Sequence, residues 1–419
     1  MSEKSLVVTA PNWPSKFADR VKYMGESPIR ALMKFLGDPT IISFAGGLPS
    51  PNTFPKWEIL VAFMQILSDP KRVISALQYG PTEGYRPLRE QLAEKVGRYG
   101  VPATADNILL TCGSQQALYL IGKIFIDENT IVCTERPTYL GAVQAYDSHG
   151  AKYCTVPMDE NGMIVDQLPK VIETYHPKFI YAIPNFHNPG GVCMSLERRI
   201  KLVEIAEKYD LFIVEDDPYG DLRFEGEHIT PIISLAKERT INLGTFSKTL
   251  SPGLRTGWVV APEKLIPELA KAKQGADLFS SLLLQMAVSA ILESGILPEH
   301  VKKSRALYSE RRDAMLSTLD KYMPKEVTWT HPEGGLFLWL TVPEKINVRE
   351  FFETARKEGV AFIPGYGFYP REVSPEGELL PERPEANATM RLNFSAETPE
   401  RIKEGIEKLA GLIVVELAK

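Results

Sequence analysis

The chain contains 419 residues, of which 44% are hydrophobic and 24% are charged. This length leaves room for roughly two or three domains, and the composition is typical of a soluble globular protein rather than a disordered or membrane-embedded one. The net charge of -5 comes from 53 acidic and 48 basic residues. This balance argues against a surface that binds nucleic acid.

The cysteines and the N-terminal residues bear on the cellular compartment. Cys112, Cys133, Cys154 and Cys193 form no C-x-x-C pair, so neither a zinc site nor a disulfide framework is predicted. The N-terminus lacks the apolar run of a signal peptide, and no later run reaches the length of a membrane span. We therefore expect a cytoplasmic protein with reduced thiols, no bound metal and no membrane partner.

Short apolar runs alternate with helical patterns through the middle of the chain. This alternation predicts a mainly parallel sheet covered by helices, with functional residues at the carboxyl ends of the strands. The predicted strands are 107–112, 130–134, 178–183, 211–215, 241–245 and 257–261. The predicted helices among them include 114–125, 139–148 and 196–209.

The C-terminal part of the chain has a different pattern. Residues 262–322 have the spacing of long amphipathic helix, and a smaller α+β unit follows. Its predicted elements are strands 327–330, 336–340 and 389–394, a helix over 348–358, and a terminal helix that begins at Thr398-Pro399. Residues 371–386 are rich in Pro and Glu and are predicted to form a surface loop. The predicted division is a large domain of residues 49–295 and a small domain of residues 15–48 and 296–419.

Lys248 lies among hydroxyl-bearing residues, in Thr245-Phe246-Ser247-Lys248-Thr249, and Arg255 follows seven positions later. A lysine can hold a phosphorylated aldehyde as an imine, while hydroxyls and a guanidinium bind its phosphate. The grouping favours an enzyme that transfers amino groups. Taken alone, it also suits a phosphate-binding loop of another kind.

Two further motifs follow predicted strands. Gly113-Ser114-Gln115 opens a helix whose free amides can bind an anion, although Ser114 alone suits an ordinary helix cap. Asp216 ends an apolar run and can keep a pyridine nitrogen protonated, with Tyr219 near the phenolic oxygen of the same ring. The plain alternative for Asp216 is a solvated acidic turn.

A third motif, Asn188-Pro189-Gly190-Gly191, also follows a predicted strand. Its amide side chain can bind the phenolic oxygen, and the same four residues are also common in turns. The neighbouring His187 has no evident partner in the sequence, and we interpret it as a loop residue.

Together these motifs resemble the class I pyridoxal-phosphate aminotransferases of fold type I. The resemblance runs from about residue 41 to the C-terminus. It rests on Asn188-Pro189-x-Gly191, Asp216-x-x-Tyr219, Ser247-Lys248 with Arg255-x-Gly257, and Met390-Arg391-Leu392-Asn393-Phe394. Phrases such as Leu77-Gln78-Tyr79-Gly80 are most similar to the subgroup of kynurenine/2-aminoadipate and archaeal aromatic aminotransferases. The implied fold is α/β, a large domain with a mainly parallel sheet between helices and a smaller α+β domain.

The resemblance implies a role for each candidate residue. Lys248 carries the cofactor imine and moves a proton, Asp216 pairs with the pyridine nitrogen, and Asn188 binds the phenolic oxygen together with Tyr219. The remaining implied contacts are Tyr139 on the ring; Ser114, Gln115, Thr245, Ser247 and Arg255 at the phosphate; Tyr79 of the neighbouring subunit of a homodimer at the same phosphate; and Arg391 with Gly47 and Asn188 at the substrate.

The implied reaction moves the amino group of an L-amino acid to 2-oxoglutarate or another 2-oxo acid in a ping-pong sequence. The donor is expected to be aromatic or 2-aminoadipate-like, because aromatic residues are abundant, although most of them also suit a core. The aromatic residues include Tyr23, Phe44, Tyr139, Phe279 and Phe368. A racemase, β-lyase or decarboxylase uses the same cofactor. A non-catalytic sensor is a third alternative, and the aminotransferase pattern, which starts near residues 20–40, leaves no room for its DNA-binding domain.

Overall fold

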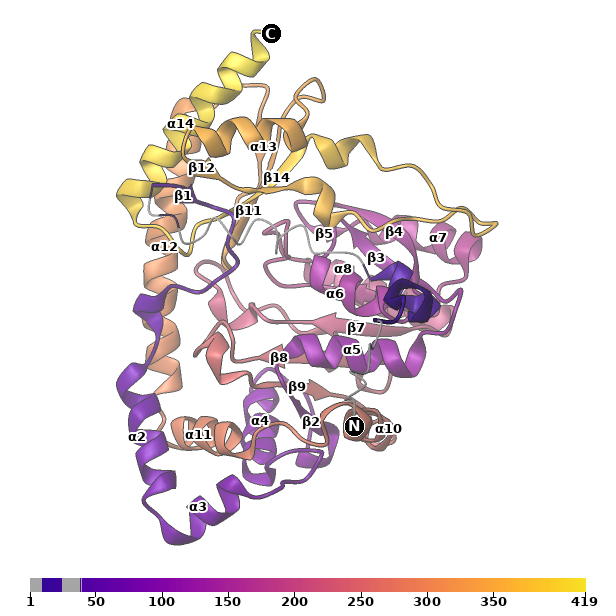
Figure 1. Ribbon diagram of the computed structural model, residues 1–419, viewed down its shortest axis with the longest axis vertical. Coiled ribbons are helices and arrows are strands. Elements are labelled where there is room, and N and C mark those ends of the chain that lie inside the picture. Colours follow the sequence, from indigo (N-terminus) through magenta and orange to yellow (C-terminus); the bar gives the residue numbers. More distant parts are fainter. Residues whose placement is uncertain (1–9, 25–37, 39) are drawn as a thin grey trace, which may run out of the picture.

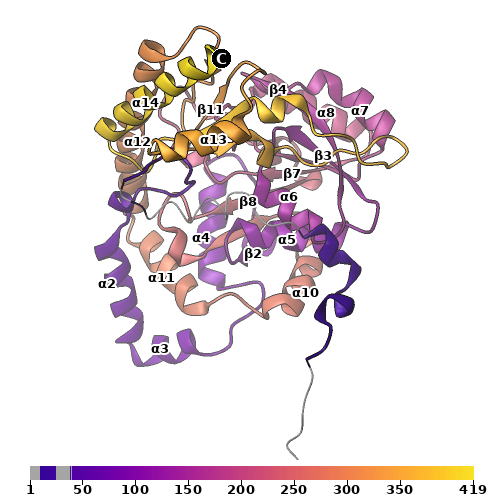
Figure 2. The same cartoon turned by 45° about the horizontal axis from the view of Figure 1, so that its top comes forward.

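The computed structural model describes residues 10–24, 38 and 40–419. Much of the N-terminal segment predicted for the small domain, residues 15–48, lies outside this part, as does the side chain of Tyr23. Figures 1 and 2 show a central sheet with helices around it, the C-terminal elements at one end, and two helices of the N-terminal half at the other.

The central sheet has eight strands in the order β2-β9-β8-β7-β6-β3-β4-β5. The pairs from β8 to β4 are parallel, and those at the two edges are antiparallel. The strands are β2 (Ile108–Thr111), β3 (Ile131–Arg136), β4 (Lys152–Asp159), β5 (Gly162–Met163), β6 (Phe179–Ala182), β7 (Phe212–Asp216), β8 (Thr240–Thr245) and β9 (Gly257–Val260). Every predicted strand of the central sheet is confirmed, with each end within two residues of its predicted place. The prediction missed β4 and β5. In β4 only residues 153–156 are buried, and the remainder, which begins at Pro157, is partly exposed.

Helices cover both faces of this sheet, which explains the apolar character of its strands. Ile213 and Val214 are consecutive in β7, so they face opposite sides, and both are fully buried. Val214 belongs to the core beneath α5, α6 and α10, whereas α7 and α8 cover Ile213, and α4 and α11 cover the same face beside β9. The bounds of the helices from residue 56 to residue 293 are α2 (Lys56–Leu67), α3 (Pro70–Leu77), α4 (Arg86–Gly97), α5 (Ser114–Phe125), α6 (Leu140–Asp147), α7 (Leu168–Tyr175), α8 (Leu196–Lys208), α9 (Ile232–Leu235), α10 (Ile266–Asp277) and α11 (Leu282–Glu293).

The long helical stretch predicted over 262–322 is three helices, α10, α11 and α12 (Leu297–Tyr322). The prediction of continuous helix is wrong because two breaks intervene. Ser281 caps α11 by accepting a hydrogen bond from the amide of Leu284, and Gly295 after α11 has a φ of 73°. Among the described helices, none alone is long and apolar enough to cross a membrane; α11 and α12 meet that test only as a pair bent by 89°.

A second, antiparallel sheet has the order β10-β11-β14-β13, and β1 pairs with β12 in parallel nearby. Its predicted strands, the helix over 348–358 and the Thr398 cap are confirmed. The pairing of β1 with β12 attaches the chain near residue 42 to the C-terminal unit, and the amide of Asn393 at the end of β14 donates to the carbonyl of Phe44. The exact domain boundaries stay a prediction. The elements are β1 (Ile42–Ser43), β10 (Thr328–Trp329), β11 (Phe337–Thr341), β12 (Val360–Ala361), β13 (Ile363–Pro364), β14 (Thr389–Asn393), α13 (Val348–Lys357) and α14 (Pro399–Leu417).

The predicted surface loop over 371–386 is partly buried. Glu372 is only 8% exposed and accepts hydrogen bonds from the Thr155 hydroxyl at 2.6 Å and from Arg383 at 3.1 Å. The amide of Val373 donates to the carbonyl of Tyr153 at 3.1 Å. The loop prediction is therefore wrong at its start, because composition does not reveal that this segment packs against β4.

We expect Glu372→Gln to lower the stability of the folded protein by about 1–3 kcal/mol, since the substitution weakens the hydrogen bonds that Thr155 and Arg383 donate to a buried carboxylate. Urea unfolding measures this change. The exposed Glu378 of the same loop supplies the matched control, and Glu378→Gln is expected to leave the midpoint in place. Equal shifts for both variants would contradict an anchoring role for Glu372.

Candidate active site

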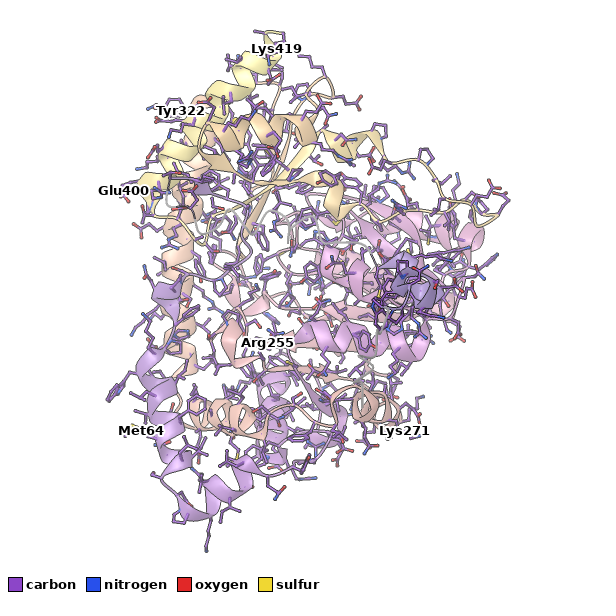
Figure 3. The ribbon with its side chains drawn as sticks, viewed as in Figure 1. Met64, Arg255, Lys271, Tyr322, Glu400 and Lys419 are labelled. Carbon is purple, nitrogen blue, oxygen red and sulfur yellow. The ribbon has the colours of Figure 1, made fainter. Side chains whose placement is uncertain are left out.

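The candidate residues meet at the carboxyl ends of adjacent strands. Gly257 at the start of β9 pairs with Thr111 at the end of β2 on one side and with Thr245 at the end of β8 on the other. Asp216 ends β7, the next strand. Because these strand ends share one edge, the segments that follow them converge there. Figure 3 labels Arg255 in this region, close to the start of α5.

Lys248 lies in the turn after β8, and its Nζ donates a hydrogen bond to the carbonyl of Gly47 at 2.7 Å. The same nitrogen is 5.9 Å from the centre of the Tyr219 ring. Burial lowers the pKa of Lys248 to about 8, and the positive charges of Arg391 and Arg255 act in the same direction. A larger fraction of this amine is therefore neutral and nucleophilic near neutral pH than for an ordinary lysine.

Asp216 differs from the two acids beside it. Glu215 accepts hydrogen bonds from the amides of Ile232 and Ile233, and Asp217 accepts one from the amide of Gly220. The Oδ1 atom of Asp216, in contrast, is buried and has no hydrogen-bond partner among the described residues.

Burial raises the pKa of Asp216 to about 7, although a hydrogen bond from Tyr181 opposes that rise. A buried carboxylate with a free oxygen is costly unless a cation pairs with it. Asp216 is thus suited to hold a protonated ring nitrogen.

A chain of hydrogen bonds connects the two sheets across the site. Arg391 of β14 donates from Nη1 to Oδ1 of Asn188 at 2.8 Å, and Nδ2 of Asn188 lies 3.4 Å from the hydroxyl of Tyr219. Arg391 also donates from Nη2 to the carbonyl of Ala45 at 3.1 Å, whereas its Nε is buried without a partner among the described residues. Its guanidinium lies 4.2 Å from the centre of the Phe337 ring.

Arg391 is only 2% exposed, and burial lowers its pKa to about 10. Its hydrogen-bond acceptors are an amide oxygen and a backbone carbonyl rather than a carboxylate. A buried guanidinium in this state is ready to bind a carboxylate from outside, because the second charge removes much of the cost of burying the first.

The predicted phosphate residues gather around the start of α5. Arg255 donates from Nη2 to the carbonyl of Cys112 at 2.9 Å, and a Cβ atom on Gly113 would lie 2.7 Å from that nitrogen. Gly113, with a φ of 73°, is the residue before the helix, so Ser114 is its first residue rather than its cap. Oγ1 of Thr245 accepts from the amide of Ser247 at 3.1 Å.

The remaining predicted residues differ in how they relate to the site. Gln115 donates its side-chain amide to the carbonyl of Gly141. Tyr139 precedes α6; burial raises its pKa to about 12, and the nearby charge of Asp216 adds to that rise. A Cβ atom on Gly47 would lie 3.7 Å from Nη2 of Arg391. Tyr79, in contrast, is 76% exposed, and its ring contacts Phe279.

Residues 67–409 match the model of the family described as aminotransferase class I and II. The chain belongs to this family. It is 42% identical to an aromatic-amino-acid aminotransferase of Thermococcus litoralis over 96% of this chain and 95% of that protein. It is 40% identical to a 2-aminoadipate transaminase of Thermus thermophilus over 95% and 96% of the two chains. A crystal structure of a Pyrococcus horikoshii kynurenine aminotransferase superposes with a TM-score of 0.90 at 40% identity, over 97% of this chain and 98% of the other.

These likenesses confirm the predicted family, subgroup and fold. The protein is an amino-acid aminotransferase, and its cofactor is pyridoxal phosphate. The described residues fit this cofactor on three grounds. Asp216 has a buried free oxygen, Lys248 has a lowered pKa, and Gly113 leaves space beside Arg255 that a side chain would fill.

Two buried features of this aminotransferase were missed in the sequence. His187 lies beside a carboxylate: its Nε2 is 3.2 Å from an oxygen of Glu135 without forming a hydrogen bond, both side chains are 1% exposed, and its Nδ1 accepts a hydrogen bond from the amide of Gly190. Tyr181 of β6 donates to Asp216. The available signal was a polar residue inside or just after an apolar strand, which indicates a buried hydrogen bond.

We expect Lys248→Met to stabilise the cofactor-free enzyme at pH 7, by an amount on the order of 2 kcal/mol, because the folded state no longer buries a charge. The pKa of Lys248 is about 8 in the folded enzyme, below its ordinary value. The penalty is therefore complete below pH 8 and disappears as the pH rises toward the ordinary lysine pKa of about 10.4.

Thermal unfolding at pH 7 and at about pH 10.5 measures the difference between Lys248→Met and the parent enzyme. The exposed Lys264 provides the control, and Lys264→Met is expected to change neither midpoint. A stabilisation that is equal at both pH values would show that packing, not charge, is responsible.

Proposed function

We propose that this aminotransferase transfers the amino group of an aromatic or 2-aminoadipate-like L-amino acid to 2-oxoglutarate or another 2-oxo acid. The observation that carries the proposal is the buried Arg391, which lacks a carboxylate partner among the described residues and is linked through Asn188 to Tyr219. A guanidinium in that position suits the α-carboxylate that every such substrate has.

The cofactor-binding roles follow from the same contacts. We assign the pyridine nitrogen to Asp216, the phenolic oxygen to Asn188 and Tyr219, and a stacking contact to Tyr139. The phosphate is assigned to the amides at the start of α5, where an anion is favoured, and to the side chains of Ser114, Gln115, Thr245, Ser247 and Arg255.

When bound, pyridoxal phosphate supplies a carbonyl carbon that reacts with amines and a ring that withdraws electrons. Lys248 would attach the cofactor through its amine, and the amino group of an incoming substrate would displace that amine. The released amine, whose neutral form is favoured by its lowered pKa, would then be free to take a proton from the substrate's α-carbon. Arg391 orients that carbon by holding the carboxylate, and Gly47 allows the chain to pass close to it.

Aromatic side chains near Arg391 support a large, apolar donor. Phe337 lies 4.2 Å and Phe368 5.1 Å from its guanidinium, measured to the ring centres. Two of the aromatic residues noted in the sequence do not add to this argument, because Phe44 is completely buried beneath Gly405 and Phe279 contacts Tyr79. The names of two relatives, an aromatic-amino-acid and a kynurenine aminotransferase, agree with such a donor, whereas the 2-aminoadipate transaminase is named for a donor whose side chain ends in a carboxylate.

A homodimer is the second part of the proposal. Seven large apolar or aromatic side chains on α2, on α3 and just after α3 each have an exposed fraction of 46% or more. An exposed apolar patch of this kind usually marks an interface. These residues are Trp57, Leu60, Met64, Leu67, Ile74, Leu77 and Tyr79. Figure 3 labels Met64 on α2. A second copy covering this face brings Tyr79 to the phosphate of its neighbour.

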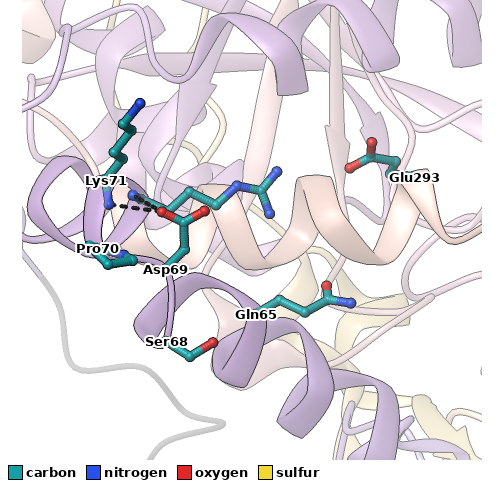
Figure 4. A pocket seen from close by; sticks show the side chains of 7 residues that line it. Gln65, Ser68, Asp69, Pro70, Lys71 and Glu293 are labelled. Atoms are coloured by element: carbon teal, nitrogen blue, oxygen red, sulfur yellow. Dashed lines mark hydrogen bonds between the residues drawn. The ribbon is translucent and has the colours of Figure 1, made fainter.

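The corner between α2 and α3 is a polar exception on this side of the molecule. Asp69 caps α3 by accepting hydrogen bonds from the amides of Lys71 and Arg72 at 2.8 and 3.0 Å (Figure 4). A surface hollow of about 900 Å³ opens there, lined mainly by polar residues that include Glu293. None of its lining residues belongs to the proposed catalytic set.

We expect at least one of tyrosine, phenylalanine, kynurenine and 2-aminoadipate to convert the bound cofactor to its amine form without an added oxo acid. The absorbance of the cofactor measures this half-reaction.

Arg391→Lys is expected to lower kcat/KM for the same donor by roughly 10- to 100-fold, because the paired hydrogen bonds to the carboxylate are lost. The exposed Arg371 provides a control, Arg371→Lys, that leaves kcat/KM in place.

Failure of all four donors would contradict the proposed substrate class. Continuous product formation without any oxo acid would instead favour a racemase, β-lyase or decarboxylase, since those reactions return the cofactor to its starting form.

Mixing two variants tests the shared site. A Tyr79→Phe subunit keeps Lys248, and a Lys248→Ala subunit keeps Tyr79, so their hybrid dimer contains one site with both native residues. We expect the hybrid to bind the cofactor at that site as tightly as the parent does, and to be more active than either variant alone. Spectroscopic titration of purified hybrids measures the affinity. A monomer in sedimentation experiments, or a hybrid no better than Tyr79→Phe, contradicts this arrangement.

A further inference from the structure

We propose that Tyr181 is a positioning residue for the reaction, whose hydroxyl holds one oxygen of Asp216 so that the other is presented to the cofactor's pyridine nitrogen. The proposal rests on the proposed function, because it takes Asp216 as the partner of that nitrogen. Tyr181 lies outside the predicted set of site residues. In this scheme it contacts neither substrate nor cofactor.

The strand register brings the two side chains together. Tyr181 of β6 pairs with Val214 of β7, and Asp216 lies two residues further along the same strand. Side chains two residues apart point to the same face of a sheet, so Tyr181 and Asp216 are diagonal neighbours. The Tyr181 hydroxyl donates to Oδ2 of Asp216 at 2.7 Å.

Burial makes this contact specific to one oxygen. Tyr181 is 0% exposed and Asp216 is 2% exposed. Oδ2 is engaged by the hydroxyl, whereas Oδ1 is buried and has no hydrogen-bond partner among the described residues. Rotation of the carboxylate would break a short bond in a site with low dielectric. The hydroxyl therefore determines which oxygen stays free.

The surroundings of Tyr181 hold its own ring in place. Tyr146 of α6 meets it edge to face, with ring centres 5.9 Å apart and an angle of 87° between the planes. The hydrogen bond also favours the charged form of Asp216, against the effects of burial and of the neighbouring Asp217 and Glu135. Tyr181 thus acts on both the orientation and the charge of the carboxylate.

Tyr146 offers a matched control in the same cluster. It is likewise 0% exposed, and its hydroxyl has no hydrogen-bond partner among the described residues. Tyr146→Phe and Tyr181→Phe each remove one buried hydroxyl and keep the ring. The two variants differ in that the second removes the hydrogen bond to Asp216.

The experiment measures the affinity of the cofactor-free enzyme for pyridoxamine phosphate by calorimetry, because this ligand binds without a covalent bond to Lys248. Tyr181→Phe is expected to weaken binding about 10-fold, the order of effect of one hydrogen bond to a charged group. It is also expected to lower kcat and leave KM for the amino acid unchanged. The affinity of Tyr146→Phe for pyridoxamine phosphate is expected to stay within about twofold of the parent's, because among the described residues the hydroxyl that it loses has no hydrogen-bond partner.

A double-variant cycle with Asp216→Asn separates positioning from general packing. If Tyr181 acts through Asp216, Tyr181→Phe has little further effect on affinity in the Asp216→Asn background. Equal losses for Tyr181→Phe and Tyr146→Phe, or a Tyr181→Phe loss that persists undiminished in that background, overturn the proposal. Parent-like binding and turnover of Asp216→Asn itself overturns the proposed role of Asp216, and the role of Tyr181 with it.

Discussion

The active site depends on the burial of Asp216 and Arg391 and the partial burial of Lys248, without a matched opposite charge for each. Burial raises the pKa of the first and lowers the pKa of the other two. Each shift reflects a cost that the folded protein bears before any ligand binds. In the proposed complex, the ring nitrogen and aldehyde of the cofactor and the carboxylate of the substrate remove that cost at the three positions. The burial that destabilises the free enzyme therefore favours the complex.

The two sheets make this burial possible. Asp216 ends one strand of the central sheet and Lys248 follows another, this sheet is covered on both faces, and Arg391 comes from the second sheet. Asn188 joins them, since its side chain contacts both Arg391 and Tyr219. The proposed carboxylate site and the proposed cofactor site thus share one side chain. A movement of one sheet relative to the other changes both sites together.

Prediction from sequence was successful where the information was local. Apolar runs of buried strands and Thr398-Pro399 at the start of α14 lie within a few residues of chain, and the structure has these elements. It failed where a distant segment decided the outcome. Residues 371–386 lack a strong pattern, yet Glu372 is buried against β4. His187 appeared to have no partner because Glu135 is far from it in sequence.

The sequence by itself determined the family, the order of the central strands' motifs and the chemical types of the site residues, because an amide, an acid, a lysine and an arginine, in that order along the chain, form a pattern that can be recognised without the fold. Only the tertiary structure decided the orientation, burial and hydrogen-bond partners of those groups. It left one oxygen of Asp216 free and engaged the other with Tyr181, and it buried Arg391 beside Asn188. Strand register and burial set these contacts, and both arise from pairing between segments that are far apart in the chain.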